Sequence, residues 1–240
     1  MAQLYSGTSG FSYPAWKPDF YPAKLPAKQF LSHYASRLNA VEINYTFRRN
    51  PTASTLEGWV SQTPGGFVFA VKAHQRITHI LKLSNAGDAT AFFLKSIDPL
   101  RATHRLGPVL VQLPPTLRAD TALLADYLAL LPPDLRFAFE FRHLSWLDER
   151  VYELLRKHNV ALCLAESEKL EVPHVLTAGF VYWRLRKAEY TAEDRALVAK
   201  AAEGWLESGK DVYLFFKHEE TPEGALYAEE IRKSLGGDAG

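Results

Sequence analysis

Short runs rich in apolar and β-branched residues alternate with amphipathic stretches along nearly the whole chain. The runs expected to form strands are Leu4–Thr8, Ala40–Asn44, Phe67–Lys72, Pro108–Leu113, Arg136–Phe141, Val160–Ala165, Phe180–Leu185 and Val212–Phe216. The stretches expected to form helices are Ala27–Leu38, Ala53–Ser61, Asp88–Thr103, Asp120–Leu130, Leu147–His158, Ala192–Ser208 and Glu223–Leu235. In the first helix Phe30, Tyr34 and Leu38 recur at a spacing that places them on one face. This alternation is typical of a parallel sheet covered by helices.

The number of alternations distinguishes between the parallel-sheet folds. Eight strands and seven helices in 240 residues favour an α/β fold with one eight-stranded parallel β/α barrel of TIM type, which usually takes about 250 residues. An open, doubly wound sheet is disfavoured because no Gly-rich phosphate-binding turn opens the first helix. Only the sixth crossover, around Ser167–Val175, lacks a helical pattern, so we expect an irregular connection there. We expect one barrel domain over residues 1–235 and a frayed tail over residues 236–240.

Composition and charge exclude several classes of protein. Hydrophobic residues make up 47% of the chain, which is enough for a sizeable core and excludes intrinsic disorder. Lys and Arg number 28 against 27 Asp and Glu, so the net charge of +1 does not indicate a nucleic-acid partner. No apolar run approaches the roughly 20 residues that cross a bilayer. With one cysteine and no signal-peptide pattern, we expect a cytoplasmic protein that is not membrane-bound. No protein partner can be named.

Strand parity predicts which side chains face the inside of the barrel. Successive side chains of a strand point to opposite faces, so the phenylalanines of Arg136–Phe141 lie on one face and Glu140 on the other. The same alternation turns polar residues inward near the carboxyl ends of five strands: Glu42, Asn44, Lys72, Gln112, Glu140 and Arg184. Barrels of this type carry their chemistry at the carboxyl-end face, which we call the barrel mouth. The candidate site is therefore the barrel mouth.

The residue types at the mouth indicate acid–base chemistry. The catalytic candidates are Glu42, Lys72 and Glu140. Two carboxyl groups beside cations in a partly dry cavity would have their pKa values tuned apart, so that one acts as base and the other as acid. The substrate-binding candidates are Ser9, Trp16, Asn44, His74, Gln112, Arg142, His143, Trp146, Arg184 and Lys217, with Arg184 as the anion clamp. Our leading hypothesis is an enzyme that acts on a small polar or anionic molecule without a metal or cofactor.

Other interpretations stay open. A metal-dependent hydrolase or isomerase could use Glu42, His74, Glu140 and His143 as ligands, but no zinc-binding spacing is present and no metal ligand is assigned. A Schiff-base role for Lys72 is disfavoured because nearby carboxylates would keep its amine protonated. The mouth could also hold a ligand without catalysis, as in a regulatory protein. Each charged residue could instead be structural, since buried charges are normally paired.

Five motifs follow one another in a specific order along the chain. They are Gly7–Tyr13 with Trp16 and Phe20–Pro22, Glu42–Phe47, Phe69–Lys72 with Ile77–His79, Leu106–Pro108 through Gln112–Pro115, and Ala138–His143 with Trp146. In this order they resemble the YecE-like family, also labelled domain of unknown function 72. The resemblance implies an eight-stranded β/α barrel and marks as motif positions Glu42, Asn44, Lys72, Gln112, Glu140, Arg142 and His143. It implies no reaction, since the activity of that family is not established.

Overall fold

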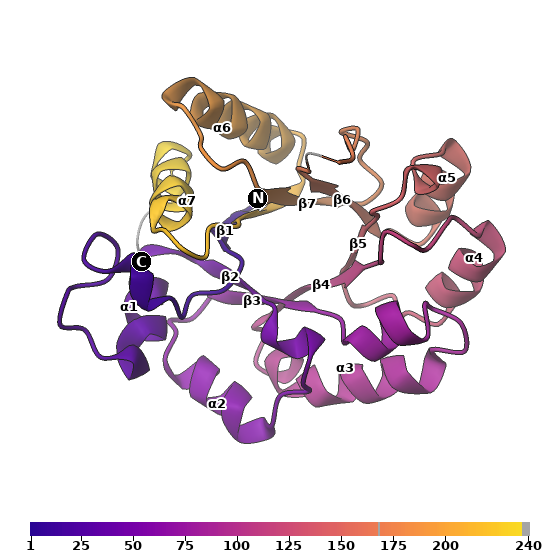
Figure 1. Ribbon diagram of the computed structural model, residues 1–240, viewed down its shortest axis with the longest axis horizontal. Coiled ribbons are helices and arrows are strands. Elements are labelled where there is room, and N and C mark those ends of the chain that lie inside the picture. Colours follow the sequence, from indigo (N-terminus) through magenta and orange to yellow (C-terminus); the bar gives the residue numbers. More distant parts are fainter. Residues whose placement is uncertain (168, 237–240) are drawn as a thin grey trace.

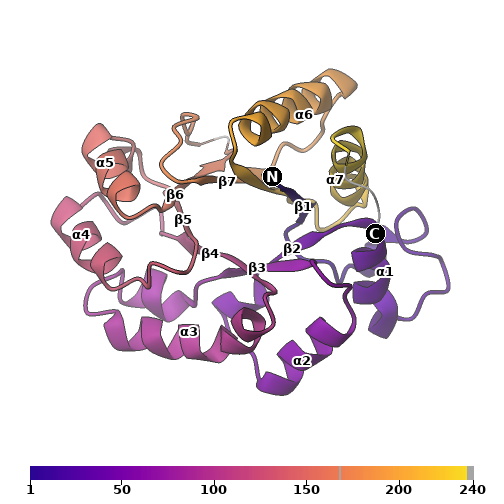
Figure 2. The same cartoon turned by 180° about the vertical axis from the view of Figure 1, so that it is seen from behind.

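Eight parallel strands form a nearly closed barrel, and the helices lie around its outside (Figure 1 and, from behind, Figure 2). The computed structural model describes residues 1–167 and 169–236. The strands are β1 (Leu4–Thr8), β2 (Ala40–Ile43), β3 (Val68–Lys72), β4 (Leu106–Gln112), β5 (Phe137–Glu140), β6 (Ala161–Ala165), β7 (Phe180–Leu185) and β8 (Asp211–Phe216). The α-helices are α1 (Phe30–Arg37), α2 (Ala53–Ser61), α3 (Gly87–Ala102), α4 (Thr121–Ala129), α5 (Glu149–Lys157), α6 (Ala192–Glu207) and α7 (Glu223–Ser234). The short helical segments are η1 (Pro14–Trp16), η2 (Ala27–Gln29), η3 (Tyr45–Phe47), η4 (Arg76–Ile80) and η5 (Leu144–Trp146).

The predicted TIM-type α/β barrel is confirmed by the strand order, in which β2 to β8 pair in parallel with their sequence neighbours, β8 pairs with β1, and a single parallel bridge joins β1 to β2. The predicted irregular crossover is also present, because the described residues between β6 and β7 contain no helix. Of the predicted tail, residues 237–240 lie outside the described residues. No helix in the described part of the chain is both long and apolar enough to cross a membrane.

Local sequence explains where the helices begin. The Thr191 side chain accepts a hydrogen bond from the backbone N–H of Asp194, and the Asp194 carboxylate accepts one from the backbone N–H of Thr191. This capping box satisfies two N–H groups that the first turn of α6 leaves without helical partners. Asp120 and Asp148 accept N–H bonds in the same way at the starts of α4 and α5.

The barrel strands separate two packed layers of side chains. Inside the barrel lie mostly small and aromatic residues, which are Ala40, Val68, Ala70, Leu110, Ala138, Ala161, Cys163, Ala165, Phe180, Tyr182, Tyr213 and Phe215. The outer layer contains Phe137 and Phe139 of β5 and packs against the helices. Each fully buried phenylalanine stabilises the fold by roughly 2 kcal/mol. Ala138 lies inside the barrel, whereas Phe137 and Phe139 lie outside it. Glu140 therefore faces the inside of the barrel, as strand parity predicts.

The seam between β1 and β2 is held largely by one amide side chain instead of a full backbone ladder. A single bridge pairs Ser9 with Glu42. Before it, the Asn39 amide oxygen accepts from the Ser6 N–H at 2.9 Å, and its nitrogen donates to the Leu4 carbonyl at 2.7 Å. Asn39 therefore supplies both hydrogen bonds that a neighbouring strand would otherwise provide.

A tyrosine completes this seam from α1. The Tyr34 hydroxyl accepts from the Thr8 N–H at 2.8 Å and donates to the Ala40 carbonyl at 2.9 Å. The strands approach closely here, because a β-carbon on Gly7 would lie 1.9 Å from the Ala40 carbonyl oxygen. Only glycine fits at position 7 without moving backbone.

We predict that Gly7→Ala lowers the free energy of unfolding by about 3 kcal/mol, because the added methyl group collides with backbone. Gly58→Ala in α2 is the matched control, since nothing lies within 4 Å of a β-carbon there. It should leave stability unchanged or raise it by up to about 1 kcal/mol, because alanine favours helix. Urea unfolding at neutral pH measures both. Equal stability of Gly7→Ala and the wild type would contradict the closeness of the seam.

Candidate functional site

A buried arginine lies at the centre of an ionic cluster at the barrel mouth. The Arg184 Nη2 donates to Glu42 Oε1 at 2.7 Å, and its Nη1 donates to Glu140. The side chains of Arg184, Glu42 and Glu140 are 2%, 0% and 2% exposed. Buried charges are tolerated when they are paired and hydrogen-bonded. One guanidinium group therefore joins β2, β5 and β7 across the inside of the barrel.

The Glu42 carboxylate accepts hydrogen bonds from three buried side chains. Besides Arg184, it accepts from the Ser9 hydroxyl at 2.7 Å and from the Tyr182 hydroxyl at 2.7 Å. Burial alone would raise the pKa of Glu42, but the Arg184 charge and these hydrogen bonds outweigh burial, and the pKa lies below its ordinary value. Glu42 is therefore ionised at neutral pH.

The Glu140 carboxylate is surrounded by cations. The Arg142 Nε donates to Glu140 Oε1 at 3.0 Å, the Gln112 amide donates to Oε2 at 2.9 Å, and the Arg186 Nη2 lies 3.4 Å from Oε1. Burial opposes ionisation, but Arg184, Arg186 and Arg142 together hold the pKa of Glu140 well below its usual range. Glu140 is therefore also ionised at neutral pH.

Lys72 ends the cluster on the β3 side. Its Nζ donates to the Gln112 Oε1 at 2.8 Å and lies 4.1 Å from the centre of the Phe47 ring. Gln112 thus lies between Lys72 and Glu140, so the amine contacts an amide and not a carboxylate. Burial and the Arg184 charge lower the pKa of Lys72 to about 8, although Glu140 and Glu42 oppose this change. Within this cluster, Lys72 changes protonation nearest to neutral pH.

The cluster holds more positive than negative charge. Its anions are Glu42 and Glu140, and its cations are Lys72, Arg142, Arg184 and Arg186. The Arg186 Nε is buried and has no hydrogen-bond partner among the described residues. Arg142 and Arg186 are 38% and 18% exposed, so both reach toward solvent. An arrangement with two cations in excess can bind an anionic group.

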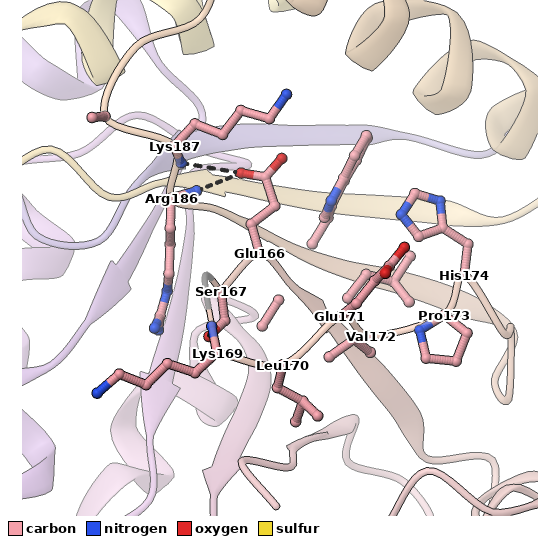
Figure 3. Close-up of a pocket in the computed structure, with 14 residues that line it drawn as sticks. Glu166, Ser167, Lys169, Leu170, Glu171, Val172, Pro173, His174, Arg186 and Lys187 are labelled. Atoms are coloured by element: carbon pink, nitrogen blue, oxygen red, sulfur yellow. Dashed lines mark hydrogen bonds between the residues drawn. The ribbon is translucent and has the colours of Figure 1, made fainter. Parts of the chain in front are cut away.

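A cavity of about 220 Å³ lies next to this excess charge. Among the described residues its charged lining consists of Glu140, Arg142, Lys169 and Arg186, so three of these four are cationic. In Figure 3 the side chains of Lys169 and Arg186 extend to the same side, away from His174. Cationic side chains in a partly enclosed cavity attract phosphate and carboxylate groups.

A larger hollow of about 990 Å³ lies between the outer side of β6–β7 and the loop that follows β6 (Figure 3). At its edge the Glu166 carboxylate accepts from the backbone N–H groups of Arg186 and Lys187, at 2.7 and 3.3 Å. The hollow lies where no helix packs in the described residues between these strands. It shares Lys169 and Arg186 with the smaller cavity, but Glu140 and Arg142 of the ionic cluster line the smaller cavity and do not line the larger hollow. The smaller cavity is therefore the candidate site.

Seven of the residues predicted for the site lie in one hydrogen-bonded cluster. They are Ser9, Glu42, Lys72, Gln112, Glu140, Arg142 and Arg184. Among the described residues, the other predicted residues form no hydrogen bond or ion pair with this cluster. Asn44 precedes η3 at the end of β2. The Lys217 Nζ lies 3.6 Å from the Glu219 carboxylate.

The predicted aromatic and histidine side chains have structural partners. Trp16 is fully buried and stacks on Tyr21, and Trp146 is fully buried and donates to the Leu117 carbonyl at 2.8 Å. The His143 Nδ1 accepts from the backbone N–H of Ser145 at the start of η5. The His74 Nδ1 accepts from the backbone N–H of Arg76. These contacts give the four side chains packing or capping roles, and the buried Nε1 of Trp16 has no hydrogen-bond partner among the described residues.

Two residues of the cluster were missed from the sequence. Tyr182 precedes Arg184 by two positions on β7, so strand parity already turns it inward toward Glu42. Arg186 follows two positions after Arg184, just beyond the strand, and the same parity extended by one step would have found it. The signal was present in both cases.

The described residues contain no group of three or more His, Cys, Asp and Glu side chains placed to hold a metal ion. The four residues that the sequence suggested as metal ligands have other hydrogen-bond partners. Glu42 and Glu140 are bonded to Arg184, and His74 and His143 are bonded to backbone N–H groups. The placement of these four side chains thus gives no support to a metal centre built from them.

We predict that Glu140→Gln lowers the free energy of unfolding by about 3 kcal/mol at pH 7, because it leaves the buried Arg184 with one carboxylate. The folded-state pKa of Glu140 lies below its ordinary value of 4.5, so its stabilisation is present above that pH and declines below it. The difference between wild type and variant should therefore narrow as the pH falls below 4.5. Glu153→Gln on the exposed side of α5 is the control. Urea unfolding at pH 7 and in acid compares all three proteins. If the difference in unfolding free energy between wild type and Glu140→Gln stayed constant with pH, the lowered pKa of Glu140 would be contradicted.

Comparisons with known proteins identify the family of this chain. The family model "Protein of unknown function DUF72" matches residues 5–239. The UPF0759 protein YunF of Bacillus subtilis is 28% identical over 156 residues, which cover 62% of this chain and 54% of YunF. The chain thus spans about half the length of this curated relative.

Two solved structures share the fold. A DUF72 family protein from Thermotoga maritima has a TM-score of 0.86 and 27% identity, covering 97% of this chain and 99% of its own. A DUF72 family protein from Enterococcus faecalis has a TM-score of 0.78 and 20% identity, covering 98% of each chain; at that identity it supports the fold alone. With a family model that matches nearly its whole length, the chain belongs to the DUF72 family of proteins of unknown function.

Proposed function

We propose that the chain is an enzyme that binds an anionic group of its substrate at the barrel mouth and transfers a proton through Lys72. The excess positive charge supports this proposal. Arg184 already pairs with both buried carboxylates, and Arg142, Arg186 and Lys72 remain around them. A cluster that served only to stabilise the barrel would balance its charges, since unpaired charge near the interior costs free energy.

The anionic group would bind between Arg142 and Arg186. Both guanidinium groups line the 220 Å³ cavity, and both are partly exposed. Guanidinium donors match the geometry of phosphate and carboxylate oxygens, and exclusion of water strengthens the attraction. The buried Nε of Arg186 would gain a partner on binding. The cations of the chain supply the positive charge that this chemistry needs, so the proposal includes no metal or cofactor.

Lys72 takes the acid–base role that the sequence suggested for Glu42 and Glu140. Both carboxylates are held ionised by Arg184, so neither has a proton to donate at neutral pH. The pKa of Lys72 is about 8, so the neutral amine and the ammonium ion are both populated near pH 8. A group with a pKa near the working pH is suited to proton transfer. The carboxylates would then position the cations.

We also propose that the enzyme acts in the cytoplasm. The single cysteine, Cys163, is buried inside the barrel and burial raises its thiol pKa well above the ordinary value. A buried thiol of this kind does not require an oxidising compartment.

The anion site is tested by calorimetric titration with inorganic phosphate, sugar phosphates and dicarboxylic acids. We expect at least one of them to bind, and Arg142→Ala with Arg186→Ala to weaken it by on the order of 100-fold, because charge-assisted hydrogen bonds contribute about 1.5 kcal/mol or more each. Arg101→Ala is the control, since Arg101 pairs with Asp134 and lies at the C-terminal end of α3, which precedes the start of β4 and not its carboxyl end. Unchanged affinity in the double variant would contradict the site.

The role of Lys72 is tested by competitive acetylation of its amine across a pH series, read by peptide mass spectrometry. We expect a reactivity midpoint that matches a pKa of about 8. Bound phosphate should move the midpoint upward, because a neighbouring anion favours the ammonium form. Lys72→Arg is the control that identifies the peptide. A midpoint at the ordinary lysine value of 10.5 would contradict the assignment.

A further inference from the structure

Four successive mouth loops carry an excess of positive charge, and their acidic residues are Asp120 and Asp148, the N-cap residues of α4 and α5. Residues 44–52, 73–86, 113–119 and 141–147 of these loops follow β2, β3, β4 and β5, and we call them the basic rim. Their cationic residues are Arg48, Arg49, Arg76, Lys82, Arg118 and Arg142, and they contain three histidines but no Asp or Glu. Because the four strands are parallel neighbours (Figure 2), the loops lie side by side at the same end of the barrel.

The cations of the basic rim are unpaired as well as clustered. Five of them are exposed and form no ion pair with any described residue: Arg48, Arg49, Arg76, Lys82 and Arg118. Elsewhere on the surface, exposed arginines have carboxylate partners, as Arg101 has Asp134 and Arg156 has Glu149. The rim therefore presents a local positive field although the whole chain carries a net charge of only +1.

Apolar side chains are exposed between these cations. Tyr45, Ile80 and Leu144 are 48%, 67% and 70% exposed, and each belongs to a rim segment. The Phe47 ring, which is half-buried, packs edge-on against His79 with ring centres 4.9 Å apart. Cations interleaved with an exposed aromatic side chain such as Tyr45 are typical of surfaces that bind single-stranded nucleic acid, where phosphates contact the cations and bases stack on the aromatic ring.

The size of the mouth cavity also points to a substrate that extends beyond it. At about 220 Å³ it is smaller than the roughly 300–1,000 Å³ that enclose a complete small ligand. The cavity thus suits one phosphate-sized group, and the rest of the ligand would lie across a neighbouring surface. The loop after β8 carries Glu219 and Glu220 against Lys217, and the loop after β6 carries Glu166 and Glu171 against Lys169. Both loops therefore have a net negative charge that repels a polyanion, and so the basic rim is the favourable side.

We propose that the basic rim binds a single-stranded nucleic acid, with one backbone phosphate in the mouth cavity and its neighbours along the rim. This inference rests on the proposed function in one respect, because the anion between Arg142 and Arg186 becomes a phosphate of the chain. It differs from the sequence-based expectation about nucleic acid, which rested on the net charge of the whole chain; that net charge averages the rim with an acidic remainder of the surface.

Fluorescence anisotropy with labelled single strands of about 20 nucleotides tests the inference. Separate titrations with RNA and DNA distinguish the two sources of phosphate, and binding of either supports the proposal. With five rim cations on phosphates, we expect affinity to fall roughly 100-fold between about 50 and 200 mM salt. A duplex of the same sequence, inorganic polyphosphate of similar length and anionic vesicles are the comparisons. Equal or tighter binding of any of these three would overturn the proposal.

Matched charge reversals locate the surface. Arg48→Glu with Arg76→Glu removes two rim cations, and Lys95→Glu with Lys200→Glu makes the same change in net charge on α3 and α6. All four side chains are exposed. The rim variant should bind single strands at least about 30-fold more weakly, whereas the control should stay within about threefold. Melting temperatures and phosphate titration check that both variants are folded with an intact mouth.

The two proposals fail in different ways. If inorganic phosphate binds at Arg142 and Arg186 while no single strand binds, the rim inference is overturned and the proposed function stands. If single strands bind through Arg48 and Arg76 while the Arg142→Ala, Arg186→Ala variant binds them as the wild type does, the rim is supported and the mouth site is overturned. Equal loss in the rim and control variants would overturn the rim inference.

Discussion

The contact on which the rest of this structure depends is the pairing of one buried guanidinium group with two buried carboxylates. Arg184, Glu42 and Glu140 are almost fully excluded from solvent, and each would be costly to bury without the others. Because they come from β7, β2 and β5, the pairing also fixes these strands relative to one another. Arg142 and Arg186 in turn pair with Glu140, and Gln112 links Glu140 to Lys72.

The closure of the barrel and the candidate site share residues. Ser9 and Glu42 form the backbone bridge between β1 and β2, and the Ser9 hydroxyl also donates to the Glu42 carboxylate. Asn39 and Tyr34 bond the remaining length of the seam. Glu42, one of the two carboxylates that pair with Arg184, lies at this seam. The packing of the seam therefore determines the geometry of the mouth. Catalytic precision of the kind proposed requires such rigid support.

The fold and much of the site could be predicted because strand parity is a local property. Parity placed Glu42, Glu140 and Arg184 inside the barrel, and the structure has them there. Parity cannot say which inward groups touch, so the amide of Gln112 between Lys72 and Glu140 was not foreseen. Nor does a loop position reveal burial, as the fully buried Trp16 illustrates. Net charge likewise conceals distribution, because acidic residues elsewhere offset the basic rim.

The measurement that tests the central claim most directly is anomalous diffraction from crystals soaked in tungstate, an anion that resembles phosphate and is easily located. The charge distribution predicts its strongest peak at the barrel mouth, in the cavity between the guanidinium groups of Arg142 and Arg186. A strongest peak in the larger hollow beside Glu166 and His174, or no ordered peak at the mouth, would contradict the claim that the excess charge of the cluster forms an anion site.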